Sequence, residues 1–518
     1  MQQAGSGRSL TALLAAAGIE QPRFGQSGAA PDGSAIGVPL EITAIDFDSR
    51  SVTPGSLFVA ITGRRSDGHR FCREAVERGA IALVAERVPE PSVDPSVPLV
   101  LVADSRLALS ALAAAFHGHP SAGLCVAGIT GTDGKTTAAT LLWHAWRAAG
   151  IAAASITTVD RRTLDSVTAN ASRQTTPEAP ELQAELASIR AGGCTHVALE
   201  TSSHGLEMHR TDDVEFRAAV FTRITTEHLE LHGSREGYLA AKARLLEQVS
   251  SRPDGIAVLD AGDSFAFPRL SVIPVATRLT YTDEPRIWAD VRAEDVVTSA
   301  TGVRFSALTP WGPAQVALRL AGRFNVRNAL AAIAAACATG ADLEHAVLGL
   351  EAAEAVTGRM ERIELGQPFA VVVDYAHTAD ALETVLQELR PTTAGRLWAV
   401  FGSAGERDLE KRPAMGSVAA RGADVSIITD EDPRHEDRDA ILEQIAAGAI
   451  AAGGHRDDTV LVIPDREEAI AFAVAHAAPG DTVLCAGKGH EKTLETAAGE
   501  LPWNERAVAT AAILRRIS

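Results

Sequence analysis

Short apolar runs recur along the whole chain and alternate with longer stretches rich in Ala and Leu. A short apolar run bounded by turn residues predicts a buried strand, and a longer Ala- and Leu-rich stretch predicts a helix. Near the N-terminus the predicted strands are 56–61, 80–85 and 99–102, and the predicted helices are 10–19, 71–78 and 106–116. This alternation predicts an α/β fold.

The middle of the chain continues the alternation and then changes character. Predicted strands at 124–127, 196–199 and 218–221 are accompanied by predicted helices at 138–149 and 238–248. Further on, 302–308 and 315–320 alternate apolar and polar residues, the pattern of antiparallel strands with one solvated face. An Ala-rich helix that ends near Gly340 follows them.

The last part of the chain repeats one arrangement. Each of its predicted strands is followed directly by a loop rich in glycine and charged residues; the strands are 369–373, 397–401, 425–428 and 482–485. Because the carboxyl ends of parallel strands meet at one edge of a sheet, this repetition predicts an open parallel sheet with one binding edge.

A chain of 518 residues is too long for a single core, because cores rarely grow beyond roughly 250 residues. The patterns predict three domains, at residues 1–120, 121–345 and 346–518. The 46% hydrophobic and 22% charged content are those of an ordinary globular protein.

Charge and cysteine content narrow the class of protein. The net charge of −18 argues against a nucleic-acid-binding role, which usually needs a basic face. The five cysteines are far apart and form no Cys-x-x-Cys pair, which favours a reducing compartment. No signal peptide and no apolar run long enough to span a membrane is evident. We therefore expect a cytoplasmic enzyme without a membrane span.

The stretch from Gly128 to Thr137 follows a predicted strand and precedes a predicted helix. In this setting Gly-Lys-Thr predicts phosphate binding, because glycine turns let backbone N–H groups converge on an anion at a helix N-terminus. Lys135 would reach the β- and γ-phosphates, and the Thr136 hydroxyl would hold Mg²⁺. The loop departs from the common spacing, and Asp133 adds a negative charge; a chance Gly-Lys-Thr is the alternative.

Polar clusters follow several other predicted strands. Glu200 and His228 each come after an apolar run, so both are expected at strand ends near a bound nucleotide. His228 and His232 have the spacing of a helical zinc pair, but no Glu follows His228 directly, so a zinc protease is disfavoured. The hydroxyl-rich segment Gln174–Pro177 is expected to cap a helix near Pro180 and to bind an anion.

Together these motifs resemble those of the Mur ligase family. The resemblance rests on the phosphate loop, Glu200, His228, Lys242, Asn325 with Asn328, Gly358–Glu361, Asp374–His377 and Gly487–Glu491. It implies an N-terminal α/β uridine-nucleotide-binding domain, a central P-loop ATPase-like domain with a parallel sheet, and a C-terminal Rossmann-like α/β domain. Members are ATP-dependent ligases that activate a carboxylate as an acyl phosphate before an amine attacks it.

The resemblance also assigns roles to individual residues. Lys135, Lys242, Glu200 and His228 would be catalytic; Mg²⁺ would be held by Thr136, Glu200, His228 and a carbamate formed on Lys242. ATP would be bound by Gly131, Thr132, Asp133, Gly134, Lys135, Thr136, Thr137, Asn325, Asn328, Arg359, Asp374 and His377. The UDP-sugar would be bound by Phe47, Ser49, Arg64, Arg65, Ser66, Gln174, Thr175, Thr176, Ser202 and Arg210. The incoming amino acid would be bound by Arg407, Glu431, Asp432, Pro433, Arg434, Gly487 and Glu491.

The pairing of Asp374–His377 with Gly487–Glu491 resembles the branch that adds the third residue of the peptidoglycan stem peptide. The implied substrates are ATP, a UDP-muramoyl dipeptide and a diamino acid, acted on by a monomer. Arg434 favours meso-diaminopimelate, because an arginine can fork onto its distal carboxylate. Asp432 stands where those relatives have Asn and favours the distal ammonium of L-lysine or L-ornithine, so the sequence leans only slightly to meso-diaminopimelate. A folylpolyglutamate synthetase-like ligase and a non-enzymatic P-loop regulator are the alternatives.

Overall fold

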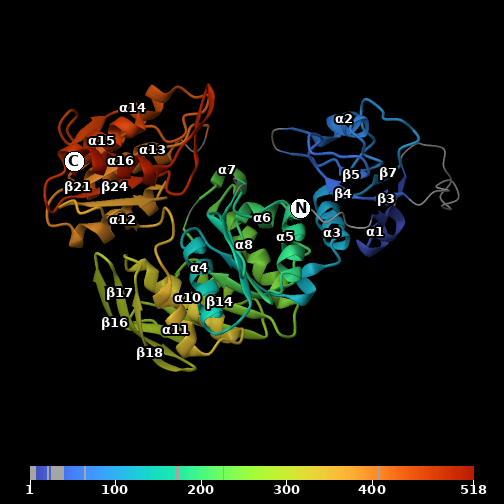
Figure 1. Cartoon of the computed structure of the whole chain (residues 1–518), viewed down its shortest axis with the longest axis horizontal. Coiled ribbons are helices and arrows are strands. Elements are labelled where there is room, and N and C mark those ends of the chain that lie inside the picture. Colours follow the sequence, from blue (N-terminus) through green and yellow to red (C-terminus); the bar gives the residue numbers. More distant parts are fainter. Residues whose placement is uncertain are drawn as a thin grey trace.

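The computed structural model describes residues 7–19, 23–24, 40–63, 66–170, 172, 174–225, 227–406 and 409–517. The chain forms three α/β units, and the N-terminal and C-terminal units stand on either side of the central one (Figure 1). The expected three-part α/β fold is therefore confirmed. Within the described part of the chain, no helix combines the length and the apolar character needed to cross a membrane.

The N-terminal unit is a five-stranded sheet in the order β2-β7-β6-β5-β4. Its strands are β2 (Arg23–Phe24), β4 (Ala44–Asp46), β5 (Ser56–Val59), β6 (Ala82–Ala85) and β7 (Leu99–Leu101), and only β2 runs antiparallel. Helices α1 (Leu10–Ala16) and α3 (Ser105–Phe116) pack Leu and Ala side chains on one face of it. Helix α2 (Cys72–Glu77) contributes to the core on the other face, and a small pair, β1 (Arg8–Ser9) with β3 (Glu41–Ile42), joins α1.

The central unit is built on an eleven-stranded sheet in the order β11-β10-β9-β12-β8-β13-β14-β15-β16-β17-β18. Its strands are β8 (Cys125–Thr130), β9 (Ala153–Ile156), β10 (Asp160–Arg162), β11 (Val167–Ala169), β12 (His196–Glu200), β13 (Phe216–Phe221), β14 (Ile256–Asp260), β15 (Thr277–Thr282), β16 (Val291–Ser299), β17 (Gly302–Thr309) and β18 (Gly312–Leu318). From β9 to β16 in this order each strand is parallel to the next, whereas β10 and β11 at one end and β17 and β18 at the other are antiparallel to their neighbours. The expected antiparallel pair is present as β17 and β18.

Helices cover both faces of this sheet. They are α4 (Lys135–Ala148), α5 (Ala179–Ala191), α6 (Ser203–Glu207), α7 (Leu229–His232), α8 (Arg235–Ser250), α9 (Phe267–Leu270), α10 (Phe324–Ala338) and α11 (Leu343–Ala352). One core contains α4, α10 and α11, and the small alanines of α10 let that helix lie close to its neighbours; the other contains α5 and α8. Because α11 packs against α4 and β18, it belongs to the central unit, so the predicted boundary at 345 cuts through a helix of that unit.

The sequence patterns missed β9 to β11, β14, β15 and β16. Strand β11 is exposed along its whole length and β15 is largely polar, so neither carries the apolar pattern that marks a strand. Helix α4 also begins earlier than expected, at Lys135, because Gly134 adopts a left-handed conformation (φ 84°) that turns the loop directly into the helix.

The helix that follows the phosphate loop is held by a buried hydrogen bond. Trp146 of α4 is fully buried, and its indole N–H donates to Thr339 Oγ1 at the end of α10 (2.9 Å). Because an unpaired buried donor costs about 1–3 kcal/mol, Thr339→Val should lower the free energy of unfolding by that amount. Urea unfolding measures this loss, with the exposed Thr301→Val as the matched control; equal stability of both variants would contradict it.

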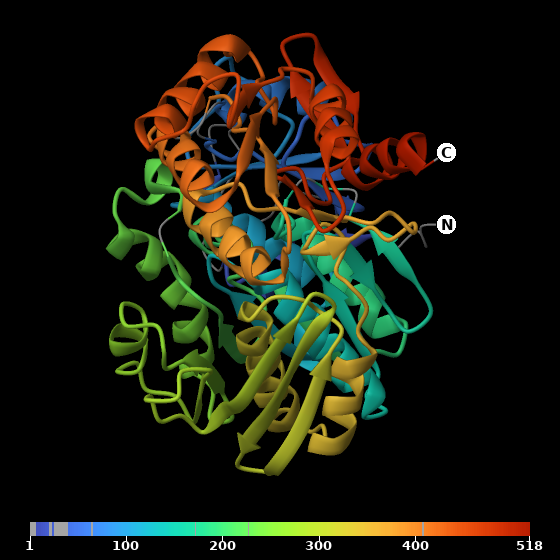
Figure 2. The same ribbon diagram turned by 90° about the vertical axis from the view of Figure 1, so that its left-hand side faces the viewer.

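The C-terminal unit contains a six-stranded sheet in the order β19-β20-β24-β21-β22-β23. Its strands are β19 (Glu361–Arg362), β20 (Ala370–Asp374), β21 (Leu397–Phe401), β22 (Val425–Ile428), β23 (Val460–Val462) and β24 (Thr482–Ala486), and a separate hairpin joins β25 (Thr493–Thr496) to β26 (Gly499–Pro502). Its helices are α12 (Ala379–Leu389), α13 (Lys411–Gly422), α14 (Arg438–Ala451), α15 (Arg466–His476) and α16 (Glu505–Ile517). Except for the antiparallel edge strand β19, the sheet is parallel, as predicted. The unit stands above the antiparallel strands β16 to β18 (Figure 2).

Candidate active-site cleft

A cleft of about 1090 Å³ is lined by residues of both the central and the C-terminal units. In the central sheet β12, β8 and β13 are adjacent and parallel, so the loops after them emerge side by side at one edge. These loops carry Glu200, the phosphate loop and His228, which all line the cleft. The strand order thus brings together side chains that are far apart in the sequence.

Two glycines of the phosphate loop lie in close contact with neighbouring side chains. A Cβ atom added at Gly131 (φ 154°) would lie 1.8 Å from Thr222 Oγ1, and one added at Gly134 would lie 2.2 Å from Asn328 Oδ1. Only glycine fits at these two positions. Lys135 Nζ donates to the carbonyl of Thr132 (2.8 Å), which holds the ammonium group over the loop at the N-terminus of α4. The arrangement suits a bound anion.

Thr136 and Glu200 form a buried pair of oxygen donors. Thr136 Oγ1 donates to Glu200 Oε2 (2.9 Å), and the N–H of Thr158 donates to the same oxygen (2.8 Å). The Glu200 side chain is 1% exposed, at the end of β12. Hydroxyl and carboxylate oxygens are the ligands that Mg²⁺ prefers, so this donor set fits Mg²⁺.

Lys242 lies beside the phosphate loop and not on the helix surface. It is 1% exposed, its Nζ donates to the carbonyl of Gly131 (2.7 Å), and the same atom lies 4.4 Å from the ring centre of Tyr238. Burial, together with the positive charge of Lys135, holds the pKa of Lys242 well below its ordinary value. A neutral amine at this position is chemically able to add CO₂.

His228 lies where the two units meet. Its Nε2 is 3.4 Å from Glu227 Oε1, and His377 Nε2 of the C-terminal unit is 3.3 Å from the same oxygen. Burial opposes ionisation of Glu227, but the hydrogen bond from His377 and the charges of His228 and Lys135 keep its pKa well below normal. Glu227 thereby raises the pKa of His377 against the effect of burial. The result is a charged contact between the units.

The ring of His204 lies 4.5 Å from that of His228 and 6.0 Å from that of His232. Burial and the two neighbouring histidines lower the pKa of His204 to about 3, so it stays neutral. The described residues contain no group of three or more His, Cys, Asp or Glu side chains placed to hold a metal ion.

The residues assigned to ATP come from two units. Asn325 and Asn328, near the start of α10, are joined by a hydrogen bond of 3.0 Å, and Asn328 packs against Gly134. Across the cleft, the guanidinium of Arg359 lies 4.7 Å from the ring centre of Tyr375, and its buried Nε has no hydrogen-bond partner among the described residues. An unpaired, buried donor that lines the cleft fits a phosphate-bearing ligand.

Asp374 is held by the N–H groups of Met360 and Ala376, each at 2.7 Å.

Burial and the nearby carboxylate of Glu227 raise the pKa of Asp133, the unusual acidic residue of the phosphate loop.

The residues assigned to the UDP-sugar fall into two separate groups. Gln174, Thr175, Ser202 and Arg210 line the cleft, and within the described part of the chain the buried Gln174 Oε1 has no hydrogen-bond partner. Thr176 lies behind them, where its hydroxyl bonds the carbonyl of Glu200 (3.2 Å) and the N–H of Ser202 (2.9 Å).

The expectation that this segment caps a helix was wrong. The N-cap residue of α5 is Glu178, and it makes no side-chain cap. Glu178 instead pairs with Arg210 (2.7 Å), whose guanidinium also donates to the carbonyl of Thr176 (2.9 Å). The hydroxyls of Thr175 and Thr176 do not cap a helix but join their loop to the loops after β9 and β12.

The second UDP group lies in the N-terminal unit, away from the cleft lining. Phe47 packs on the core of that unit, Ser49 donates to Glu74 (3.1 Å), and the carbonyl of Ser66 accepts from Gly63 N–H (2.9 Å). Arg64 and Arg65 lie outside the described residues. The two UDP groups are therefore not brought together within the cleft.

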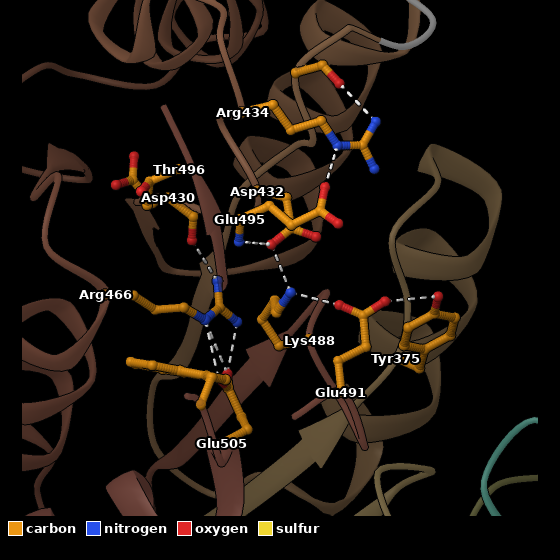
Figure 3. A network of polar contacts seen from close by, with 12 residues as sticks. Tyr375, Asp430, Asp432, Arg434, Arg466, Lys488, Glu491, Glu495, Thr496 and Glu505 are labelled. Carbon is orange, nitrogen blue, oxygen red and sulfur yellow. Dashed lines mark hydrogen bonds and ion pairs between the residues drawn. The ribbon is translucent and has the colours of Figure 1, made fainter. Parts of the chain in front are cut away.

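The residues assigned to the amino acid form a charged network at the C-terminal end of the cleft (Figure 3). Lys488, which is fully buried, donates to Asp432 Oδ1 (2.8 Å) and to Glu491 Oε2 (2.5 Å). Arg434 Nε donates to Glu495 Oε2 (2.7 Å). Glu431 is buried beside Gly487, Pro433 precedes Arg434 in the same loop, and Arg407 lies outside the described residues.

Among the residues that the sequence analysis did not assign to the site are Glu227, Tyr238 and Glu495, which line the cleft, and Lys488, which lies behind Asp432. Glu227 and Tyr238 carry a signal, because one adjoins His228 and the other opens the helix of Lys242. Lys488 lies inside the motif Gly487–Glu491. Nothing in the sequence marks Glu495, which acquires its neighbours only through the hairpin β25–β26.

Three family models match the chain. They are "Mur ligase family, catalytic domain" over residues 41–117, "Mur ligase middle domain" over 129–336 and "Mur ligase, glutamate ligase domain" over 358–489. The chain is 48% identical to a UDP-N-acetylmuramyl-tripeptide synthetase of Roseiflexus sp., over 91% of this chain and 94% of that protein.

The chain is also 43% identical to a UDP-N-acetylmuramoyl-L-alanyl-D-glutamate–2,6-diaminopimelate ligase of Streptomyces coelicolor, over 94% of each chain. A solved structure of a ligase with the same name superimposes with a TM-score of 0.62 at 32% identity, covering 92% of this chain and 96% of that one. The similarity therefore extends over all three units.

Proposed function

The chain belongs to the Mur ligase family of ATP-dependent ligases, and from this we propose that it joins a diamino acid to UDP-N-acetylmuramoyl-L-alanyl-D-glutamate. One observation carries the proposal. A single cleft contains a phosphate loop from the central unit and a charged end from the C-terminal unit. Such a cleft allows ATP, a carboxylate and an amine to meet away from bulk water.

The chemistry needs activation, because a carboxylate and an amine do not condense in water. The substrate carboxylate attacks the γ-phosphate of ATP, which gives an acyl phosphate and ADP. The amine then attacks the acyl carbon, and phosphate leaves as the amide forms. Lys135 and the N-terminus of α4 stabilise the charge of the transferred phosphoryl group, and Arg359 approaches the nucleotide from the other unit.

Mg²⁺ would be held by Thr136, Glu200, His228 and a carbamate on Lys242, and when bound it supplies positive charge to the phosphate oxygens. Unmodified Lys242 is an amine bonded to Gly131 and offers no oxygen ligand. Addition of CO₂ to the neutral amine, with loss of a proton, converts it into an oxygen donor. The low pKa and the position of Lys242 support this modification.

The contact of Glu227 with His377 supports a role in closing the cleft. It links the loop after β13 to the loop after β20, and so holds the C-terminal unit over the phosphate loop. Exclusion of water protects an acyl phosphate from hydrolysis. We assign the UDP-sugar to the groups in the N-terminal and central units, acting within one monomer.

The two alternatives explain less. A folylpolyglutamate synthetase-like ligase does not account for an N-terminal unit matched by the family model over 41–117. A nucleotide-binding regulator does not account for the charged end that faces the phosphate loop across the cleft.

Phosphate release from ATP tests the proposal. We expect release only when UDP-N-acetylmuramoyl-L-alanyl-D-glutamate and a diamino acid are both present, because each half of the reaction consumes one of them. The measurement is phosphate release with each substrate omitted in turn. Sustained release from ATP alone, or release that folate and glutamate support in their place, would contradict the proposed function.

A further inference from the structure

We propose that Glu495, on the hairpin β25–β26, makes the site select a diamino acid whose distal carbon carries an ammonium group and no carboxylate. The inference rests on the proposed ligase function and concerns the end of the cleft around Asp432, Arg434 and Glu491. Arginine at position 434 favours meso-diaminopimelate when the sequence alone is considered. The structure shows what that arginine contacts.

Arg434 is engaged on two sides (Figure 3). Its Nε donates to Glu495 Oε2 at 2.7 Å, and its Nη1 donates to the carbonyl of Gly405 at 3.2 Å. An arginine that recognises a carboxylate by a fork uses two N–H groups along one edge. A substrate carboxylate that approached the Nε edge would have to displace Glu495.

The pair is fixed by the backbone around it. The N–H of Arg434 donates to the carbonyl of Glu495 (3.0 Å), and the N–H of Glu495 donates to Asp432 Oδ1 (2.8 Å). Arg434 and Thr496 also form an isolated β-bridge. The hairpin is thereby tied to the loop after β22, so the glutamate is held in place against the arginine. The two side chains are 17% and 26% exposed.

The charged side chains at this end of the cleft also favour a substrate without a distal carboxylate. Among the described residues that line it, the acidic ones are Asp432, Glu491, Glu495 and Glu500, and the basic ones are Arg434 and Lys492. Lys488 lies behind the surface and contacts Asp432 and Glu491. A distal ammonium meets this acidic end favourably, whereas a second carboxylate on the same carbon is repelled.

The inference therefore identifies the substrate as L-lysine or L-ornithine, which differ only in chain length. Glu495 acts in two ways: it occupies Arg434, and it adds a negative charge where the extra carboxylate of meso-diaminopimelate would lie. Glu495→Gln keeps the size of the side chain and removes the charge, so it should free Arg434 for a carboxylate. The matched control is Glu467→Gln, another arginine-paired glutamate of the same unit, outside the cleft lining.

The experiment measures kcat and KM of the full-length enzyme for L-lysine, L-ornithine and meso-diaminopimelate, with ATP and the UDP-muramoyl dipeptide saturating. We expect kcat/KM of the unaltered enzyme for L-lysine or L-ornithine to exceed that for meso-diaminopimelate by about tenfold or more. Glu495→Gln should reduce this ratio by about tenfold, mainly through KM, and Glu467→Gln should leave it unchanged. The double variant Asp432→Asn with Glu495→Gln should shift the ratio further.

Each other outcome has a defined meaning. The inference is overturned if the unaltered enzyme prefers meso-diaminopimelate, or if Glu495→Gln leaves the ratio unchanged, because Glu495 would then not select the substrate. Loss of activity toward all three amino acids in a folded Glu495→Gln enzyme also overturns it, because the role would then be structural. If the unaltered enzyme uses none of the three, the proposed function fails instead.

Discussion

Lys135→Ala should reduce kcat/KM for ATP-dependent ligation by about 100- to 1,000-fold, roughly 3–4 kcal/mol of transition-state stabilisation. The reason is electrostatic. Lys135 Nζ is held over the phosphate loop by Thr132, at the N-terminus of α4, where negative charge develops as the phosphoryl group is transferred. A donor that is already in place needs no reorganisation, so its removal is costly.

The measurement is steady-state phosphate release with both acceptor substrates present. The matched control is Arg147→Ala, which removes an exposed cation from the last turn of the same helix. That variant should retain turnover within about threefold of the unaltered enzyme. If Lys135→Ala retains as much, the loop is not catalytic.

The second large effect is expected at Lys242. Lys242→Met should lower turnover by about 100-fold or more, because it removes the group from which the proposed metal-binding carbamate forms. Methionine fills a similar volume, so the loss cannot be ascribed to a cavity in the buried position. The unaltered enzyme should lose activity when CO₂ is removed and regain it on addition of bicarbonate.

Two controls separate the carbamate from other roles of the lysine. Lys242→Glu places a permanent carboxylate on the same helix, so it should retain more activity than Lys242→Met and should not respond to CO₂. Short-chain carboxylates in the buffer should restore part of the activity of Lys242→Ala. Full activity of Lys242→Met would show that the lysine is only a structural neighbour of Gly131 and Tyr238.

The contrast between Arg434 and Lys242 shows why partners matter more than residue type. Both are basic residue types that the family resemblance assigned to the site. Burial beside another cation holds the pKa of Lys242 low, which prepares it for modification. Arg434 is instead paired with a carboxylate from a hairpin about which its own motif carries no information. Two basic residue types thus have different chemical roles: an amine open to modification and a cation held by a carboxylate.

The sequence by itself determined the α/β class, the phosphate loop and several of the charged side chains that line the cleft. It could do so because these features are local: an apolar run marks a buried strand, and a polar loop directly after it lies at the carboxyl edge of a parallel sheet. The strands 397–401 and 425–428 were predicted with their observed ends, since apolar residues fill both faces of a buried parallel strand.

Only the tertiary structure decided which of these side chains meet. The order β12-β8-β13 places Glu200 and His228 on either side of the phosphate loop, and no local pattern encodes strand order. The contact of Glu227 with His377 needs two units to close on each other, and the pairing of Arg434 with Glu495 needs a hairpin to fold back across the sheet edge. The sequence gives the chemical type of each residue. The distance between two charges is set only when the chain folds, and that distance determines their effect on a substrate.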